Sequence, residues 1–132
     1  MSKENWTTKN IPDLSNKTII ITGANSGLGF ATSKALANNN ATVVMACRNI
    51  QKGETAKSTI MKECPHANIE VMELDLMDLS SVKSFAQNFI ARYHSIDILI
   101  NNAGIMMPPY FTTKDGFESQ LGTNHLGHFA LT

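Results

Sequence analysis

The segment TGANSGLG, residues 22 to 29, constrains the fold more than any other part of the chain. It follows the β-branched run from Lys17 to Thr22, which predicts a short buried strand, and residues 28 to 37 carry a small-residue pattern that predicts a helix. One glycine is enough for a sharp turn. Three glycines between a strand and a helix favour a loop whose backbone closely approaches a bound phosphate.

Strand-like and helix-like segments alternate along the rest of the sequence. Further strands are expected at residues 41–47, 69–74 and 96–100, and helices at residues 50–62, after Asp78 and, more weakly, at 114–131. The helix at residues 50–62 has Asn49 as its expected N-cap and is stopped by Pro65. The helix after Asp78 has the clearest one-sided apolar pattern, at Val82, Phe85, Ala86, Phe89, Ile90 and Tyr93.

This alternation, with nearly continuous apolar strands, predicts an α/β protein with a parallel sheet covered on both faces. The expected architecture is a Rossmann-like doubly wound sheet, incomplete, with about four strands in the order 3-2-1-4 and flanking helices. Residues 1–16 are expected to be a polar N-terminal arm, and residues 17–132 the N-terminal part of a dinucleotide-binding domain. In this order the strand at 96–100 is an edge strand.

Each glycine of the loop has a possible task in such a fold. Gly23 permits the exit from the strand, Gly27 lets backbone approach a pyrophosphate, and Gly29 allows close helix packing. The N–H groups and the dipole at the start of the following helix favour an anion there. The spacing is GxxxGxG rather than GxGxxG, so a glycine-rich connection without a ligand is the alternative.

Arg48 indicates which dinucleotide the site would prefer. It ends the second strand, where an acidic residue would bind a ribose hydroxyl and an arginine would accommodate a 2′-phosphate. A guanidinium suits phosphate by charge and by its planar fork of donors. NADP(H) is therefore predicted over NAD(H). The alternative is that Arg48 is an ordinary surface residue, exposed to solvent at the end of a strand.

Five motifs together make residues 17–132 similar to the short-chain dehydrogenase/reductase family: TGANSGLG, ACRN, LDL, NNAG and TNHLGHF, in this order. The residues within these motifs most resemble the branch of the family that contains retinol dehydrogenases, the WW-domain oxidoreductase and protochlorophyllide-reductase-like enzymes. The resemblance implies an oxidoreductase that transfers hydride between nicotinamide and a carbonyl or alcohol, with an apolar substrate. A noncatalytic dinucleotide-binding or interaction module is the alternative.

The resemblance also implies roles for individual residues. Asp75 would contact the adenine amino group with Leu76 beside it, and Asn124 would help to hold a water in the proton relay. Asp75 could instead cap a helix, the NNAG segment could be a turn, and Asn124 could be structural. A helix at 114–131 would place Phe117, Leu121, Asn124, His128 and Leu131 on one stripe, with Asn124 facing inward. The predicted cofactor-binding residues are Gly23, Asn25, Ser26, Gly27, Leu28, Gly29, Arg48, Asn49, Asp75, Leu76, Asn102, Ala103 and Gly104.

The resemblance implies a catalytic serine and a YxxxK pair further along the chain than the segment that contains Asn124, and the given sequence ends at Thr132. Tyr110 and Lys114 have the YxxxK spacing, but they precede that segment. The sequence is therefore expected to be the N-terminal half of a reductase or a truncated product, inactive by itself.

Composition excludes several other classes. Eleven basic residues balance eleven acidic ones, so no net charge favours nucleic acid. No run is long and apolar enough for a membrane span, and the histidines lack metal-site spacing. Cys47 and Cys64 are expected to be reduced thiols of an intracellular, cytoplasmic protein. By resemblance, a homodimer is possible.

Overall fold

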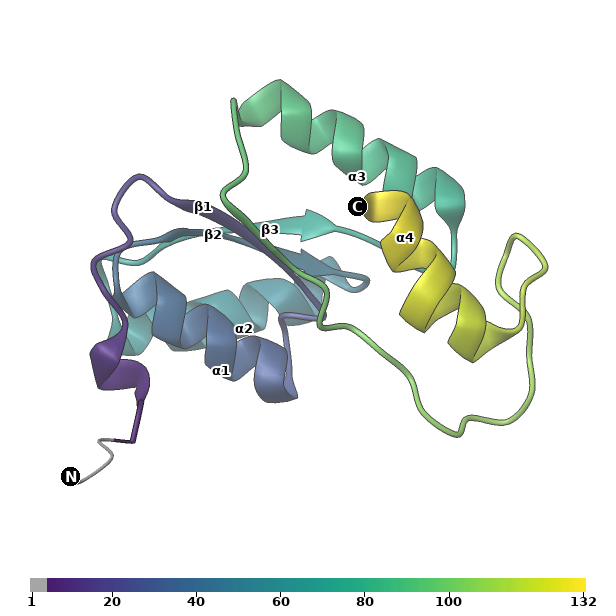
Figure 1. Cartoon of the computed structure of the whole chain (residues 1–132), viewed down its shortest axis with the longest axis horizontal. Helices are drawn as coiled ribbons and strands as arrows, with labels where there is room; N and C mark the ends of the chain where they lie inside the picture. The colour runs from purple at the N-terminus through teal and green to yellow at the C-terminus, as the bar shows by residue number, and fades with distance from the viewer. Residues whose placement is uncertain (1–4) are drawn as a thin grey trace.

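The computed structural model describes residues 5–132, which form a four-stranded parallel sheet with helices on both faces (Figure 1). The strand order is β3-β2-β1-β4, which confirms the predicted order and the Rossmann-like architecture. The strands are β1 (Thr18–Thr22), β2 (Thr42–Cys47), β3 (Asn68–Glu73) and β4 (Ile98–Ile100). The helices are the 3-10 turn η1 (Thr8–Asn10), α1 (Gly27–Asn38), α2 (Ile50–Glu63), α3 (Leu79–Arg92), the π-helical turn η2 (Leu121–Leu126) and α4 (Gly127–Leu131).

Parallel pairing brings the carboxyl ends of all four strands to the same edge of the sheet. In β1, Ile19 pairs with Val43 of β2 on one side and with Ile98 of β4 on the other. The chain moves outward from β1 to β3 and then returns to the opposite side of β1 with β4. The edge beyond β1 is therefore the point where strand order reverses, which is where ligands bind in such sheets.

Side-chain caps start two of the helices at the predicted places. The Oδ1 atom of Asn49 accepts a hydrogen bond from the backbone N–H of Lys52 at 3.0 Å and opens α2. Asp78 accepts from the backbone N–H of Ser80 at 2.9 Å and opens α3. Hydrogen bonding by the Ser80 side chain, with a further contribution from Lys114, holds the pKa of Asp78 below its usual value.

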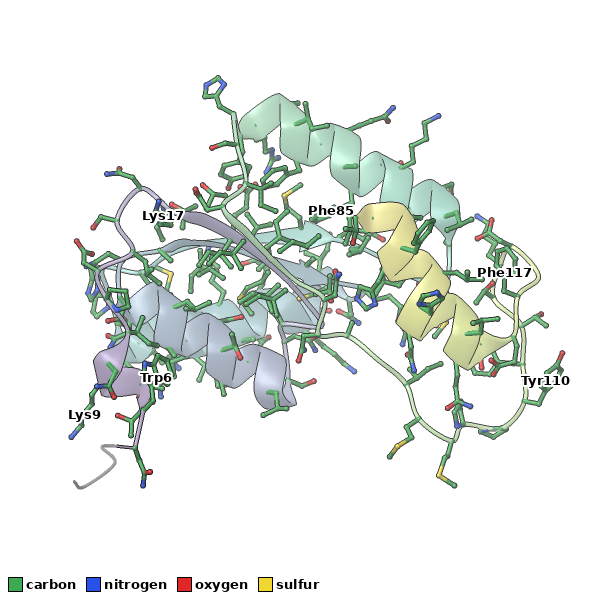
Figure 2. The ribbon with its side chains drawn as sticks, viewed as in Figure 1. Trp6, Lys9, Lys17, Phe85, Tyr110 and Phe117 are labelled. Atoms are coloured by element: carbon green, nitrogen blue, oxygen red, sulfur yellow. The ribbon has the colours of Figure 1, made fainter. Side chains whose placement is uncertain are left out.

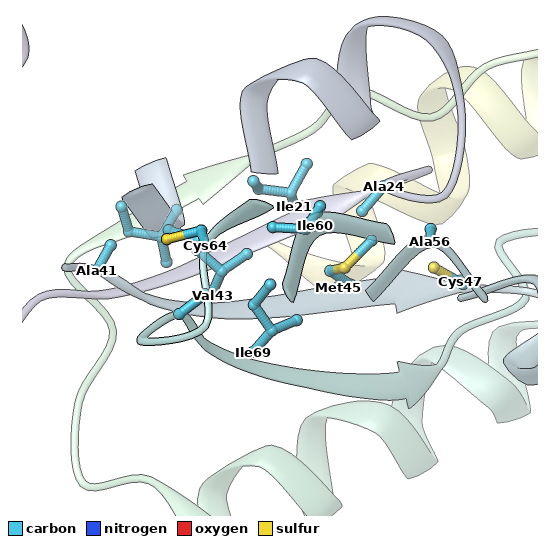
Figure 3. Close-up of a cluster of buried hydrophobic side chains, with 13 residues drawn as sticks. Ile21, Ala24, Ala41, Val43, Met45, Cys47, Ala56, Ile60, Cys64 and Ile69 are labelled. Atoms are coloured by element: carbon cyan, nitrogen blue, oxygen red, sulfur yellow. The ribbon is translucent and has the colours of Figure 1, made fainter. Parts of the chain in front are cut away.

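The face of the sheet under α1 and α2 is closed by apolar side chains (Figure 3). Met45 and Val43 of β2 and Ile60 of α2 have no exposed surface. Both cysteines are free and belong to this cluster. Continuous apolar strands in the sequence correctly indicated this burial.

The opposite face packs against α3 and α4, and Phe85 lies between α3 and the sheet (Figure 2). Val82 and Phe89 of the predicted α3 stripe are also buried. Ile90 is not, because its side chain is 75% exposed beside the β4 edge. The expectation that Ile90 faces the core is wrong: within the described residues, no strand follows β4 to cover that end of the face.

The predicted helix at 114–131 starts later than expected. Residues 112–118 form a turn closed by a bridge between Thr112 and Glu118, with Gly116 at a φ of +86°. The Glu118 carboxylate accepts from the backbone N–H groups of Leu121 and Gln120, which lowers its pKa and opens the helical segment. Phe117 therefore lies outside the helix, in the same outer segment as Tyr110 (Figure 2).

Candidate dinucleotide site

The glycine loop joins the end of β1 to the start of α1, and two of its glycines are required by close backbone contacts. Gly23 has a φ of +61°, and a Cβ atom there would lie 2.8 Å from the Cα of Ala103. A Cβ on Gly29 would overlap the carbonyl oxygen of Gly23 and crowd the Asn102 amide. These two glycines let the loop, the start of α1 and the segment after β4 touch one another.

Gly27 has a different surrounding. It adopts a φ of +56°, and a Cβ there would meet no atom within 4 Å. Ser26 is the N-cap of α1, yet its side chain makes no capping hydrogen bond. The N-terminus of α1 thus has no side-chain cap and has open space beside Gly27. A phosphate at a helix N-terminus binds to such uncapped backbone N–H groups.

Thr22 fixes the segment after β4 against this loop. Its Oγ1 accepts hydrogen bonds from the backbone N–H groups of Asn102 and Ala103, each at 2.9 Å. The Asn102 side chain returns a bond to the Thr22 carbonyl at 3.1 Å and another to that of Gly23 at 3.4 Å. Asn102 therefore holds loop backbone, whereas Asn101 bonds to the Thr132 hydroxyl.

The same threonine determines which tautomer His128 adopts. Because Thr22 Oγ1 already accepts two N–H groups, its own proton points to His128 Nε2, 2.8 Å away. His128 Nε2 therefore accepts, and Nδ1 carries the proton that is donated to the Asn124 carbonyl at 3.1 Å. Buried Thr22 and His128 connect β1, the segment after β4 and the helical segment η2–α4.

Seven of the predicted residues line one small depression of about 150 Å³ at the strand ends: Gly23, Asn25, Arg48, Asp75, Leu76, Ala103 and Gly104. Asp75 does not cap α3, since Asp78 does so. Its Oδ1 accepts from the backbone N–H of Met77 at 2.9 Å, and its own N–H is bound by Ser81 Oγ. These bonds fix the Asp75 carboxylate and its backbone at the depression.

A wider depression of about 800 Å³ lies between the starts of α1 and α2. Asn25, Ser26, Gly27 and Asn49 line it, together with Lys52. Asn25 belongs to both depressions, so they adjoin at the glycine loop. Leu28 lines neither and is 80% exposed.

Asn124 is not buried, contrary to the expectation that it faces inward. Its Oδ1 accepts from the Ile105 N–H and its Nδ2 donates to the Ile105 carbonyl, both at 2.8 Å. The expected stripe assumed a regular α-helix, but the N–H of Gly127 bonds to the Gly122 carbonyl in a π-helical turn. This extra residue per turn changes which side chains face the sheet. Asn124 lines a third depression of about 320 Å³ with His128 and Phe129.

Cys47 lies directly beneath the loop. Burial raises the pKa of its thiol to about 11, and the backbone N–H groups of Ala24 and Asn25 oppose this increase. The group is therefore neutral at physiological pH. It supports the loop from below as a small apolar side chain.

Sequence reasoning missed four residues of the site: Thr22, Lys52, Thr123 and, as a hydrogen-bonded bridge, His128. A signal existed for Thr22, because it is a polar residue that ends a strand of three isoleucines. No comparable signal existed for Thr123, whose position depends on the π-helical turn.

Among residues 5–132, no group of three or more His, Cys, Asp or Glu side chains is placed to hold a metal ion. No helix in the described part of the chain is long and apolar enough to cross a membrane.

A parallel sheet with a glycine loop at its switch point defines the class of α/β proteins that bind dinucleotides. Comparisons with known proteins give the family. The model of the short chain dehydrogenase family matches residues 17–132. Human retinol dehydrogenase 12 is 50% identical over 119 residues, which are 90% of this chain and 38% of that protein. The chain belongs to the short-chain dehydrogenase family, whose members bind nicotinamide dinucleotides.

Solved structures agree with this assignment. An uncharacterised protein from Mycobacterium paratuberculosis is 54% identical with a TM-score of 0.85, covering 96% of this chain and 44% of that one. A metagenomic short-chain oxidoreductase in complex with NADP is 25% identical with a TM-score of 0.74, covering 90% and 54%. The chain spans less than half the length of the retinol dehydrogenase it matches.

Proposed function

We propose that the protein is an NADP(H)-dependent oxidoreductase that transfers hydride between nicotinamide and an apolar carbonyl or alcohol. The observation that carries the proposal is the open space at Gly27 in front of the uncapped N-terminus of α1. A backbone with no Cβ and several free N–H groups suits a pyrophosphate. When bound, the nicotinamide would supply the hydride chemistry.

The adjoining depressions suit the remaining parts of this cofactor. Asp75 presents a carboxylate that can accept from an adenine amine, and Leu76 lies beside it. Gly23, Asn25, Ala103 and Gly104 form the wall of the same depression. Asn102 and Gly29 hold the loop in shape from behind. Asn124 would act as a positioning residue, since its amide fixes the Ile105 backbone.

Two cations support NADP(H) over NAD(H). Arg48 is exposed at the end of β2 and forms no ion pair within residues 5–132; its Nη1 lies 3.9 Å from Met77 Sδ. Lys52 and Asn49 line the neighbouring depression. A guanidinium with unused donors and a nearby ammonium suit a 2′-phosphate.

Support for an apolar substrate comes from the segment after β4. Met106, Met107 and Tyr110 are each at least 80% exposed, and Phe129 lines the depression that contains Asn124. An apolar group could bury these side chains.

Titration of the complete natural polypeptide with NADPH and NADH tests the cofactor proposal. Arg48→Asp should weaken NADPH binding by about 10- to 100-fold and leave NADH within about threefold, because charge-assisted bonds to phosphate are lost. Lys83→Asp, at an exposed position on α3, is the matched control for the change in charge. Unchanged discrimination in Arg48→Asp would remove Arg48 from the site.

A nucleotide-binding module without chemistry is the second candidate for residues 1–132 taken alone. Tyr110 and Lys114 have the YxxxK spacing, but Tyr110 is 80% exposed and Lys114 pairs with Asp78 at 3.2 Å. Neither lines any of the three depressions, which favours binding without turnover. NADPH consumption with long-chain aldehydes, measured for the complete polypeptide and for residues 1–132, separates the candidates. Turnover by residues 1–132 alone would contradict the assignment of catalysis to a tyrosine and lysine outside them.

A further inference from the structure

Thr123 carries a buried hydroxyl that has no partner in the protein. The residue is 6% exposed, and its Oγ1 is the one buried side-chain oxygen or nitrogen within residues 5–132 that makes no hydrogen bond. A threonine in a regular helix can donate to the carbonyl four residues earlier. Thr123 instead lies in the π-helical turn η2 and makes no such bond. An unpaired buried hydroxyl is costly, so it calls for a partner that the chain itself does not supply.

The position of Thr123 identifies where that partner would be. Thr123 lines the small depression together with Asp75, Leu76 and Gly104. One turn later Gly127 packs so closely against Leu76 that a Cβ there would lie 2.5 Å from the Leu76 carbonyl oxygen. This contact packs η2 and α4 against the segment that follows the carboxyl end of β3. Thr123 therefore lies at the depression that also holds the Asp75 carboxylate.

We propose that the Thr123 hydroxyl is a further cofactor-binding group, which forms a hydrogen bond with the adenosine end of the bound dinucleotide. The inference rests on the proposed function, because it assigns the depression to that part of the cofactor. A hydroxyl both donates and accepts, whereas an ionised Asp75 only accepts. Thr123 thus complements Asp75 in recognising an adenosine, whose base and ribose carry groups of both kinds.

The isosteric variant Thr123→Val tests the inference in the complete natural polypeptide. NADPH and 2′,5′-ADP, which contains only the adenosine end, should both bind about tenfold more weakly, because one hydrogen bond is lost. Thr123→Ser keeps the hydroxyl and should remain within about threefold of the original protein. Without cofactor, the melting temperature of Thr123→Val should not fall, since the hydroxyl has no protein partner to lose. Thr123→Ala is a second hydroxyl-free variant if the valine prevents folding.

Three results would overturn the inference: unchanged affinity for both ligands in Thr123→Val, a loss for NADPH with none for 2′,5′-ADP, or an equal loss in Thr123→Ser. Gly27→Val, measured in parallel, keeps the two proposals distinguishable. If Gly27→Val loses NADPH binding while Thr123→Val retains it, only the role of Thr123 fails. If Gly27→Val still binds NADPH, the proposed function fails at the phosphate site itself.

Discussion

The two faces of the sheet differ in how completely they are covered. Under α1 and α2, the strand and helix side chains form a closed layer in which Ile60 and Met45 have no exposed surface. On the face under α3 and α4, Phe85 is buried, but Ile90 and Ile98 beside the β4 edge are 75% and 43% exposed. The glycine loop rests on the closed face. Thr22 and His128 hold the loop in place by hydrogen bonds to the segments on the less covered face, under α3 and α4.

This difference shows how the site is supported. The loop's shape comes from packing below it, where Cys47 and Ala24 are buried. Its position relative to the segment after β4 comes from hydrogen bonds of Thr22 and Asn102 instead. Packing energy is spread over many contacts, whereas these bonds depend on single atoms. The side of the site toward β4 should therefore be more sensitive to single polar substitutions.

The largest expected contrast is between two isoleucines on helices of opposite faces. Ile60→Ala should lower the free energy of unfolding by about 4 kcal/mol, since it leaves a cavity in the closed layer. Ile90→Ala should change it by less than about 0.5 kcal/mol, because that side chain is mostly exposed. Urea unfolding of the complete polypeptide measures both. Equal losses at the two positions would remove the contrast between the faces.

A smaller effect on stability is expected at Thr22, which connects the glycine loop to the segment after β4. Thr22→Val keeps the side-chain shape but leaves the Ala103 N–H unpaired and His128 Nε2 without its donor. It also removes one of the two acceptors of the Asn102 N–H, which keeps its bond to the Ile100 carbonyl. The free energy of unfolding should fall by about 3 kcal/mol. Thr22→Ser retains the oxygen and should lose only about 1 kcal/mol for the missing methyl group. If serine and valine were equally damaging, packing rather than hydrogen bonding would hold this connection.

The smallest effect concerns Cys47 and appears only at high pH. Burial raises the pKa of its thiol from 9.0 in the unfolded chain to about 11. Above pH 9 the unfolded thiol ionises first, so its contribution to stability is lost as the pH rises from about 9 to 11. The melting temperature of the original protein should fall relative to that of Cys47→Ala over this range, and not between pH 7 and 8. A difference that is independent of pH would contradict the raised pKa of the Cys47 thiol.

Much of this arrangement could be predicted from sequence, and the failures have physical causes. The strand order, the cap Asn49 and the helix after Asp78 follow from local patterns, because apolar periodicity and cap chemistry act over a few residues. The orientation of Asn124 could not be predicted, since a π-helical turn depends on packing against distant segments. The unpaired Thr123 hydroxyl has the same origin. Exposure of Ile90 depends on which strands follow β4, information that a helical pattern does not contain.

The central claim is that Gly27 leaves space for a phosphate in front of α1, and a pair of glycine variants tests it most directly. Gly27→Val and Gly116→Val each place a branched side chain at a positive φ next to open space, so both should lose similar stability, about 1–3 kcal/mol. Only Gly27 faces the proposed site. Calorimetric titration of the complete polypeptide with NADPH should show at least about 100-fold weaker binding in Gly27→Val and little change in Gly116→Val. Equal NADPH affinities in the two folded variants would contradict the account.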